Sequence, residues 1–196
     1  MGILLGQQIN LKLVSKGFTG SQTLIFSTAI GNGIINSILA TNIYSGATIG
    51  TGPGPGIGIG KVVGLVGTVV GQNIFTMMGS HGIAGSQSLN TAMGIGEAFA
   101  EHVMSLGIVN SAGAPVAIGT GTGPITGVLG APMGQMIMSM LSSSGMVGSQ
   151  SLNLAMAIGD GIALSMSTAI VNTVITGVPS PPTPIPTAGV ETGKLI

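Results

Sequence analysis

The residues best suited to acid–base or metal chemistry are three neighbouring ionisable side chains, Glu97, Glu101 and His102. On a helix the two carboxylates lie one turn apart on one face, where they could hold a metal ion. Two related segments, described below, carry Asn32, Asn36 and Ser37 or Asp160, Leu164 and Ser165 at these positions, so the cluster is not a repeated feature. No nucleophile stands with a base and an orienting acid. The sequence therefore predicts no catalytic residue, no metal site and no enzymatic activity.

A second motif that could bind a ligand is Gly58-Ile-Gly60-Lys61, which resembles part of a phosphate-binding loop. A Walker loop requires glycine where Pro55 stands and Ser or Thr where Val62 stands. The related segment Gly121-Thr-Gly123 has no lysine after it. We therefore expect these glycines to be structural and predict no cofactor and no small-molecule substrate.

The composition excludes further classes of function. Four Lys+Arg balance four Asp+Glu, and only 4% of the residues are charged, against about 25% in an ordinary soluble domain. The lysines are scattered and there is no arginine, which disfavours nucleic-acid binding. The absence of cysteine excludes disulfides and thiolate metal sites. A surface so poor in charge gives little protection against association, so we expect the protein to work as part of an assembly.

The chain is organised around a motif that occurs three times and opens a helix-like run each time. A Gly-Gln pair precedes each copy by the same distance, which a chance match would not produce. The copies of the motif are Gly20-Ser21-Gln22, Gly85-Ser86-Gln87 and Gly148-Ser149-Gln150, and the pairs are Gly6-Gln7, Gly71-Gln72 and Gly134-Gln135.

Each copy is predicted to form a helix hairpin, the first beginning with a short helix over 7–15. The first helix should end at a glycine in the left-handed conformation, which suits the position just past a helix end. Those glycines are Gly17, Gly82 and Gly145. The serine of each motif, Ser21, Ser86 or Ser149, is expected to cap the second helix through its hydroxyl.

The second helices share a stripe of small residues four apart, centred on Gly31, Gly96 and Gly159. A glycine inside a helix costs about 1 kcal/mol relative to alanine. Its presence at the same place three times predicts that a neighbouring helix occupies the space. The next residue is polar each time, Asn32, Glu97 or Asp160, and is expected to be solvated or to hydrogen-bond at an interface.

Between the hairpins the sequence predicts linkers over 44–57 and 111–119, followed by extended Gly-x-Gly segments beginning at Gly58 and Gly121. Residues 178–186 hold five prolines and are predicted to be a polyproline-like arm, able to reach about 28 Å at about 3.1 Å per residue.

The end of the chain resembles the start of a repeat. Gly193-Lys194-Leu195-Ile196 matches residues 60–63, so we expect it to complete the repeat that Met1 begins, lying beside residues 1–6 of the same chain or of another. The prediction is one mainly α domain, 1–196, with short glycine-rich extended segments and three strand-plus-hairpin repeats in a pseudo-threefold arrangement. Repeat 1 covers about 1–56 and is completed by 189–196, repeat 2 covers 57–119, repeat 3 covers 120–177, and the proline-rich arm covers 178–188.

The mean hydropathy of +0.71 raises the question of a membrane. Each long helix is interrupted by polar residues, such as Asn32, Glu97 or Asp160, and none offers the 18 or more uninterrupted apolar residues typical of a span. Constitutive membrane spanning is not expected, whereas conditional insertion remains open.

The triplicated Gly-Ser-Gln motif, the Ile-Gly-x-Gly-Ile helix and the glycine-rich segments together resemble small, cysteine-free virion structural proteins of tailed bacteriophages. The resemblance implies a virion component of the tail or baseplate, assembled in the host cytoplasm, with other virion proteins and copies of itself as partners. It implies no site residues and no nucleic-acid partner. The alternative is a membrane-active protein that is ejected and inserts into a bilayer during infection.

Overall fold

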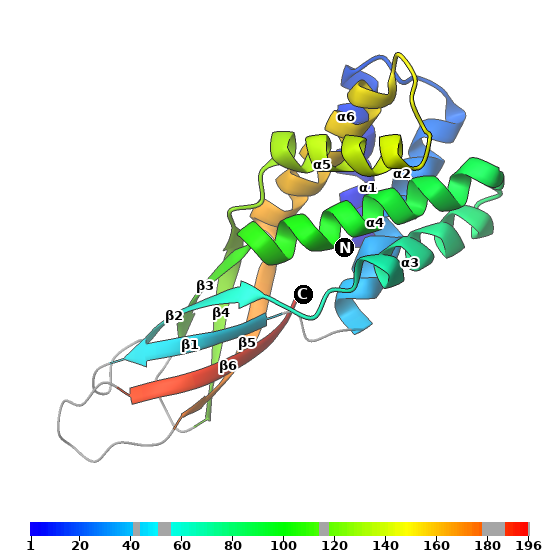
Figure 1. The fold of residues 1–196 in the computed structure, drawn as a ribbon. Coiled ribbons are helices and arrows are strands. Elements are labelled where there is room, and N and C mark those ends of the chain that lie inside the picture. Colours follow the sequence, from blue (N-terminus) through cyan, green and yellow to red (C-terminus); the bar gives the residue numbers. More distant parts are fainter. Residues whose placement is uncertain (41–43, 51–55, 114–117, 178–186, 196) are drawn as a thin grey trace.

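The computed structural model describes residues 1–196 except 41–43, 51–55, 114–117, 178–186 and 196. The described residues form six α-helices and six β-strands, and the order helix, helix, strand, strand occurs three times along the chain. The fold is therefore mainly helical with a sheet, as predicted. The helices gather at one end of the molecule, and the strands extend from them to the other end (Figure 1). We call these two parts the head and the barrel.

The head consists of three helix pairs, in each of which a helix packs against the next one in the chain. Helix α2 also packs on α3, α4 on α5, and α6 returns to α1, so the six helices form a closed ring. The predicted hairpins are confirmed, although α1 begins at Gly2 rather than at Gln7. The helices are α1 (Gly2–Ser15), α2 (Ser21–Ala40), α3 (Gly67–Ser80), α4 (Ser86–Leu106), α5 (Gly130–Ser143) and α6 (Ser151–Thr168).

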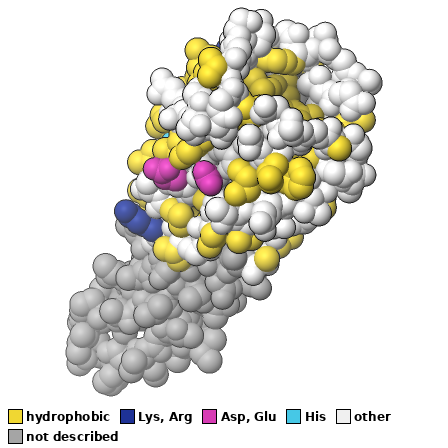
Figure 2. Space-filling model, turned by 45° about the vertical axis from the view of Figure 1, so that its right-hand side comes forward, with side chains coloured by type: hydrophobic (Ala, Val, Ile, Leu, Met, Phe, Trp, Pro, Cys, Tyr) yellow, Lys and Arg dark blue, Asp and Glu magenta, His cyan; other side chains and the backbone are white. Residues whose placement is uncertain are grey.

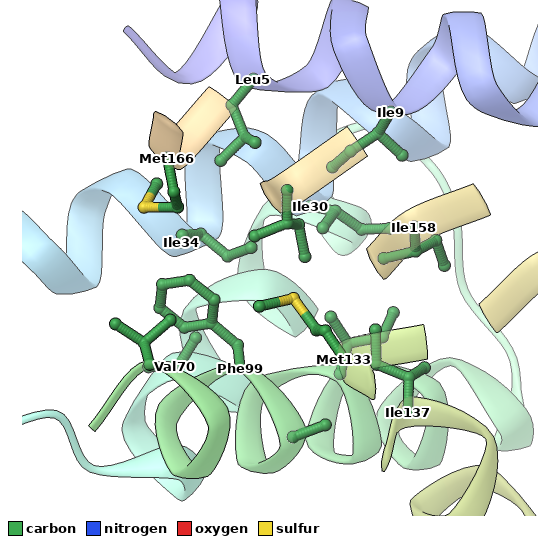
Figure 3. Close-up of a cluster of buried hydrophobic side chains, with 14 of the residues drawn as sticks. Leu5, Ile9, Ile30, Ile34, Val70, Phe99, Met133, Ile137, Ile158 and Met166 are labelled. Carbon is green, nitrogen blue, oxygen red and sulfur yellow. The ribbon is translucent and has the colours of Figure 1, made fainter. Parts of the chain in front are cut away.

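All six helices contribute to one core, which lies inside the ring (Figure 3). Its apolar residues recur at intervals of four along each helix, which places them on one side of it. Burying a side chain of this size stabilises the fold by about 1.5–3 kcal/mol. The innermost layers hold Leu5, Val70 and Met133, then Ile9, Ile74 and Ile137, then Ile30, Ile95 and Ile158, and then Ile34, Phe99 and Ile162.

The three turns inside the helix pairs share one geometry. Gly17, Gly82 and Gly145 have φ values of 88°, 76° and 76°. In the first turn the amide of Gly17 donates to the carbonyl of Val14, and the amide of Phe18 donates to that of Leu13. This is the Schellman pattern, in which a left-handed glycine satisfies the last carbonyls of a helix. The predicted helix ends are confirmed.

The predicted serine caps are wrong where the structure defines the cap. The residue that caps α4 is Gly85, and the residue that caps α6 is Gln150, and neither makes a side-chain capping hydrogen bond. Ser86 is already the first helical residue of α4, whereas Ser149 lies in the turn before α6. The amides of Ser88 and Ser151 donate to the carbonyls of Gly85 and Gly148 at 3.0 Å. Backbone turns therefore replace the expected hydroxyl caps.

The strands form a closed barrel in which every neighbouring pair is antiparallel. The predicted extended segments are confirmed in part, because β2 ends at Val62 and β4 ends at Thr126, before the apolar residues that follow. The predicted linkers are wrong, because they contain β1 and half of β3 as well as the starts of β2 and β4. The strands are β1 (Tyr44–Gly50), β2 (Gly56–Val62), β3 (Ile108–Gly113), β4 (Ile118–Thr126), β5 (Ile170–Gly177) and β6 (Thr187–Leu195).

Strand β6 closes the barrel by pairing with β1 within the same chain, with Gly193 opposite Tyr44. The same register joins Gly60 to Val109 and Gly123 to Val171. The proline-rich residues 178–186 lie outside the described residues. Gly177 and Gly189, on either side of this segment, are direct partners in the sheet, and the predicted reaching arm itself lies outside the described residues.

Candidate assembly surface

The glycines predicted to admit a neighbouring helix do so. A Cβ atom added to Gly31 would lie 3.0 Å from the Cα of Gly6, one on Gly96 would lie 2.6 Å from the Cα of Gly71, and one on Gly159 would lie 2.8 Å from the Cα of Gly134. Real Cβ atoms do not approach backbone this closely. Each helix pair therefore depends on a glycine-to-glycine contact between its two helices.

The polar residue after each of these glycines faces the start of the neighbouring helix. A Cβ added to Gly2, Gly67 or Gly130 would lie 2.9, 2.7 or 2.8 Å from the Cα of Asn32, Glu97 or Asp160. The first turn of a helix carries partial positive charge, and an acidic group there stabilises it by about 0.3–1 kcal/mol. Glu97 and Asp160 therefore lie where a negative charge favours α3 and α5. This repeated position is thus structural.

The structure separates the ionisable cluster that the sequence singled out. Glu101 is exposed and Glu97 is partly exposed, whereas His102 is 1% exposed. The amide of Leu129, at the start of α5, donates to Nε2 of His102 at 3.2 Å. An Nε2 that accepts a hydrogen bond belongs to a neutral imidazole with its proton on Nδ1. Burial lowers the pKa of His102. His102 is therefore an interior packing residue.

Glu97 and Glu101 instead line an open groove of about 500 Å³ between α3 and α4. Apolar atoms of Val66, Ala100 and Met104 form much of its wall. The described residues contain no group of three or more His, Asp or Glu side chains placed to hold a metal ion. We call this groove the acidic groove.

A second groove, of about 410 Å³, lies at the end of the head that is remote from the barrel. Its lining includes turn residues from two helix pairs, Phe18 and Ile83, together with Phe26 and Leu154. No charged side chain is among its lining residues. This groove can accept an apolar group and offers no acid–base chemistry.

Helix α1 presents large aliphatic side chains on its outer face. Ile3, Leu4, Leu11 and Val14 are 61%, 64%, 60% and 47% exposed. They alternate with the core residues of the same helix, and the exposed Gln7 lies between Leu4 and Leu11 on the outer face. The face drawn in Figure 2 shows hydrophobic side chains spread over the head with few charged ones among them. An exposed apolar face of this kind is a candidate interaction surface.

The sequence analysis missed this outer face, although its signal was present. The outward spacing of Leu4, Leu11 and Val14 is itself helical, and it runs beside the inward series in the same segment. The predicted motif residues lie at helix starts and helix contacts instead. Of the residues predicted to close the repeats, Gly193, Lys194 and Leu195 lie in β6, and Ile196 lies outside the described residues.

Comparison of the chain with protein-family models, with curated proteins and with solved structures finds no match. Among the described residues, α2 is a helix long and apolar enough to cross a membrane, with a mean hydropathy of 1.4 over its most apolar window of 18 residues. Half of that window is buried inside the protein. Burial between α1 and α3 accounts for this apolar character.

Proposed function

We propose that the protein is a structural component of an assembly, and that the assembly is a virion, in the tail or baseplate of a tailed bacteriophage. The observation that carries the assembly function is the exposed aliphatic face of α1 on a head whose surface is poor in charge. Burying such a face against another protein removes apolar area from water, which stabilises the contact by about 25 cal/mol per Å².

The proposal includes a pseudo-threefold organisation of the chain. Its support is the recurrence of the same contacts in each unit: the glycine pairs inside the helix hairpins, the polar residue at each helix start, and the matching register of β6, β2 and β4 with the strands that follow them. In this organisation the last strand completes the first unit within one chain, and the rigid head presents three related but chemically distinct faces to its partners.

The virion assignment rests on the resemblance in repeat pattern and composition. It is tested by quantitative mass spectrometry of purified particles from cells that make the protein. A structural component is expected at a fixed ratio to the other particle proteins, and the ratio should survive washing in high salt. Absence from the particles, or a ratio that falls with each wash, would contradict the assignment.

A membrane-active function is the second candidate, and the length and apolar character of α2 favour it. It requires the head to open, because half of the best window of α2 is buried. A dye-release assay on liposomes separates the two functions. A purely structural protein leaves the vesicles intact, whereas a membrane-active one releases the dye on its own.

We do not propose an enzymatic function. The acidic groove has Glu97 and Glu101 as its ionisable lining residues, and the second groove has none. The one buried imidazole accepts its hydrogen bond from a backbone amide.

A further inference from the structure

Four of the five charged residues of the head form two pairs of like charge, and the fifth is Asp160 on α6. Lys12 and Lys16 lie one turn apart at the end of α1, and Glu97 and Glu101 lie one turn apart on α4. Like charges at this spacing destabilise a helix slightly. Within the described part of the chain, none of the four makes an ion pair. In a protein with so few charges, both pairs are retained without an ion-pair partner, although Glu97 also faces the start of α3.

Each pair occurs in only one of the three units. The positions that correspond to the lysines hold Met77 and His81 in the second unit and Met140 and Ser144 in the third. The positions that correspond to the glutamates hold Asn32 and Asn36 in the first unit and Asp160 and Leu164 in the third, so only one of them is charged. Each chain therefore carries one basic pair, on the first helix of one unit, and one acidic pair, on the second helix of another.

Both pairs have apolar surroundings that suit a protein contact. The lysines flank the exposed face of α1, where Leu11 and Val14 are more than two-fifths exposed. The glutamates line the acidic groove, whose walls include Val66 and Met104. Complementary charges around an apolar centre set the orientation and the choice of partner more than the affinity.

We propose that the basic end of α1 in one copy of this chain binds the acidic groove of a second copy. Lys12 and Lys16 would lie against Glu97 and Glu101, and Leu11 and Val14 would cover the apolar wall of the groove. This inference rests on the proposed assembly function and names the partner and the two surfaces.

The contact joins two different surfaces, so it is heterologous and repeats from copy to copy. The basic end of α1 lies beside the turn at Gly17, at the end of the head remote from the barrel, whereas the acidic groove lies where β2 enters α3. Successive copies would therefore be staggered along the long direction of the head, and the contact generates a ring if the rotation closes or a filament if it does not.

The test is a charge exchange between the two surfaces in the purified full chain. The wild type is expected to associate reversibly in sedimentation velocity runs over a concentration series. Lys12→Glu/Lys16→Glu and Glu97→Gln/Glu101→Lys should each raise the dissociation constant at least tenfold. An equimolar mixture of the two variants should associate again, because each then offers the surface that the other needs.

A matched control changes charge outside the proposed contact. Thr76→Glu/Ser139→Glu places acidic groups at the positions of α3 and α5 that correspond to Leu11, and it should associate like the wild type. Far-UV circular dichroism and the thermal midpoint check that every variant is folded. If a surface variant unfolds, Lys16→Glu and Glu101→Lys, which alter exposed side chains only, replace the double variants.

A wild type that stays monomeric at all concentrations would overturn the proposal, and so would single-surface variants that associate normally or a mixture that does not recover. The virion assignment is judged separately. Finding the protein in particles while the charge variants associate normally overturns this contact alone. Charge-dependent association of a protein that is absent from particles overturns the virion assignment alone.

Discussion

The contact between α2 and α3 and the contact between α4 and α5 occupy corresponding places in the ring but are filled differently. In the first, Gly33 lies against the backbone of Ile74, where an added Cβ would be 2.6 Å from its amide nitrogen. In the second, the corresponding residue is Ala98, which is fully buried. One methyl group more at this position requires the two helix backbones to lie farther apart.

The polar groups differ in the same way. Between α2 and α3 the Ser37 hydroxyl accepts from Asn73 at 2.8 Å and donates to the carbonyl of Gly33 at 2.9 Å. Between α4 and α5 the larger His102 takes the place of Ser37 and reaches Leu129. In the third contact, between α6 and α1, Ser165 has a buried hydroxyl without a hydrogen-bond partner among the described residues. Corresponding places in the ring therefore hold polar groups with different hydrogen bonds.

The largest expected effect on stability comes from placing alanine at position 33 in the contact between α2 and α3, so that it resembles the contact between α4 and α5. Gly33→Ala should destabilise the protein by about 2 kcal/mol, because the new methyl meets backbone atoms of Ile74 that cannot move alone. Urea denaturation followed by circular dichroism measures the change. Gly79→Ala is the control, since nothing lies within 4 Å of a Cβ there; it should be neutral or stabilising by up to about 1 kcal/mol. Equal effects of the two substitutions would contradict the packing argument.

Replacing the corresponding serine by alanine should change the stability of the protein in opposite directions in two of the contacts. Ser37→Ala leaves Asn73 without its acceptor in a part-buried site and should cost about 1–2 kcal/mol. Ser165→Ala removes a buried hydroxyl that has no partner and should stabilise the protein by about 1 kcal/mol. Unfolding in urea at pH 7.5 compares them directly. Destabilisation by both would show that Ser165 has a partner in solution, such as an ordered water.

Ala98→Gly tests whether the second contact can close to the separation of the first. The loss of a buried methyl and of helix propensity should destabilise the protein by about 1 kcal/mol. If α4 moved in to fill the space, the neutral His102 would be displaced from the amide of Leu129. A changed imidazole signal in the NMR spectrum of the variant, with the rest of the head unperturbed, would show that movement.

The smallest expected effect is a dependence on pH that only the second contact possesses. Burial lowers the pKa of His102 below its usual 6.5, so on acidification the unfolded chain takes up this proton before the folded one does. The stabilisation present above pH 6.5 is therefore lost progressively as the pH falls toward the lower folded pKa. Helix α5, which packs against it, has no ionisable side chain, and α4 itself adds only Glu97 and Glu101.

Urea midpoints between pH 5 and 8 measure this slope. His102→Ser, the residue found at both corresponding positions, should flatten it between pH 5.5 and 7. His81→Ser is the matched control, because His81 is exposed beside a turn, and its slope should follow the wild type. An unchanged slope in His102→Ser would exclude the buried imidazole as its cause.

The head was predictable from the sequence because its signals are local. The left-handed glycines, the glycine contacts and the interval of four between Ile30, Ile34 and Ile38 all lie within single hairpins. The replacement of serine hydroxyl caps by backbone carbonyls at the helix starts was not predictable, because either group can accept hydrogen bonds from the amides of the first turn.

Only some strands of the barrel were predictable from the sequence. Strands β2 and β4 contain branched residues between their glycines, whereas β1 and β3 are rich in Gly, Ser and Ala and resemble linkers. Residues of low strand propensity become strands here because both neighbours supply hydrogen bonds, and that information lies in distant segments. The acidic groove was likewise invisible, since Val66 and Met104 come together only through packing.

The pairing of Tyr44 with Gly193 also has a consequence for the order of events during synthesis. Strand β1 meets β2 soon after both emerge, but its other edge must wait for β6, the last strand to be made. During that interval the nascent sheet is open along an edge that could template pairing with another chain. Closing a loop of this length is also slow compared with forming the hairpins. Until β6 pairs with β1, the nascent chain therefore exposes an open sheet edge while its helices are already formed. This is the stage at which protection by chaperones against aggregation matters most.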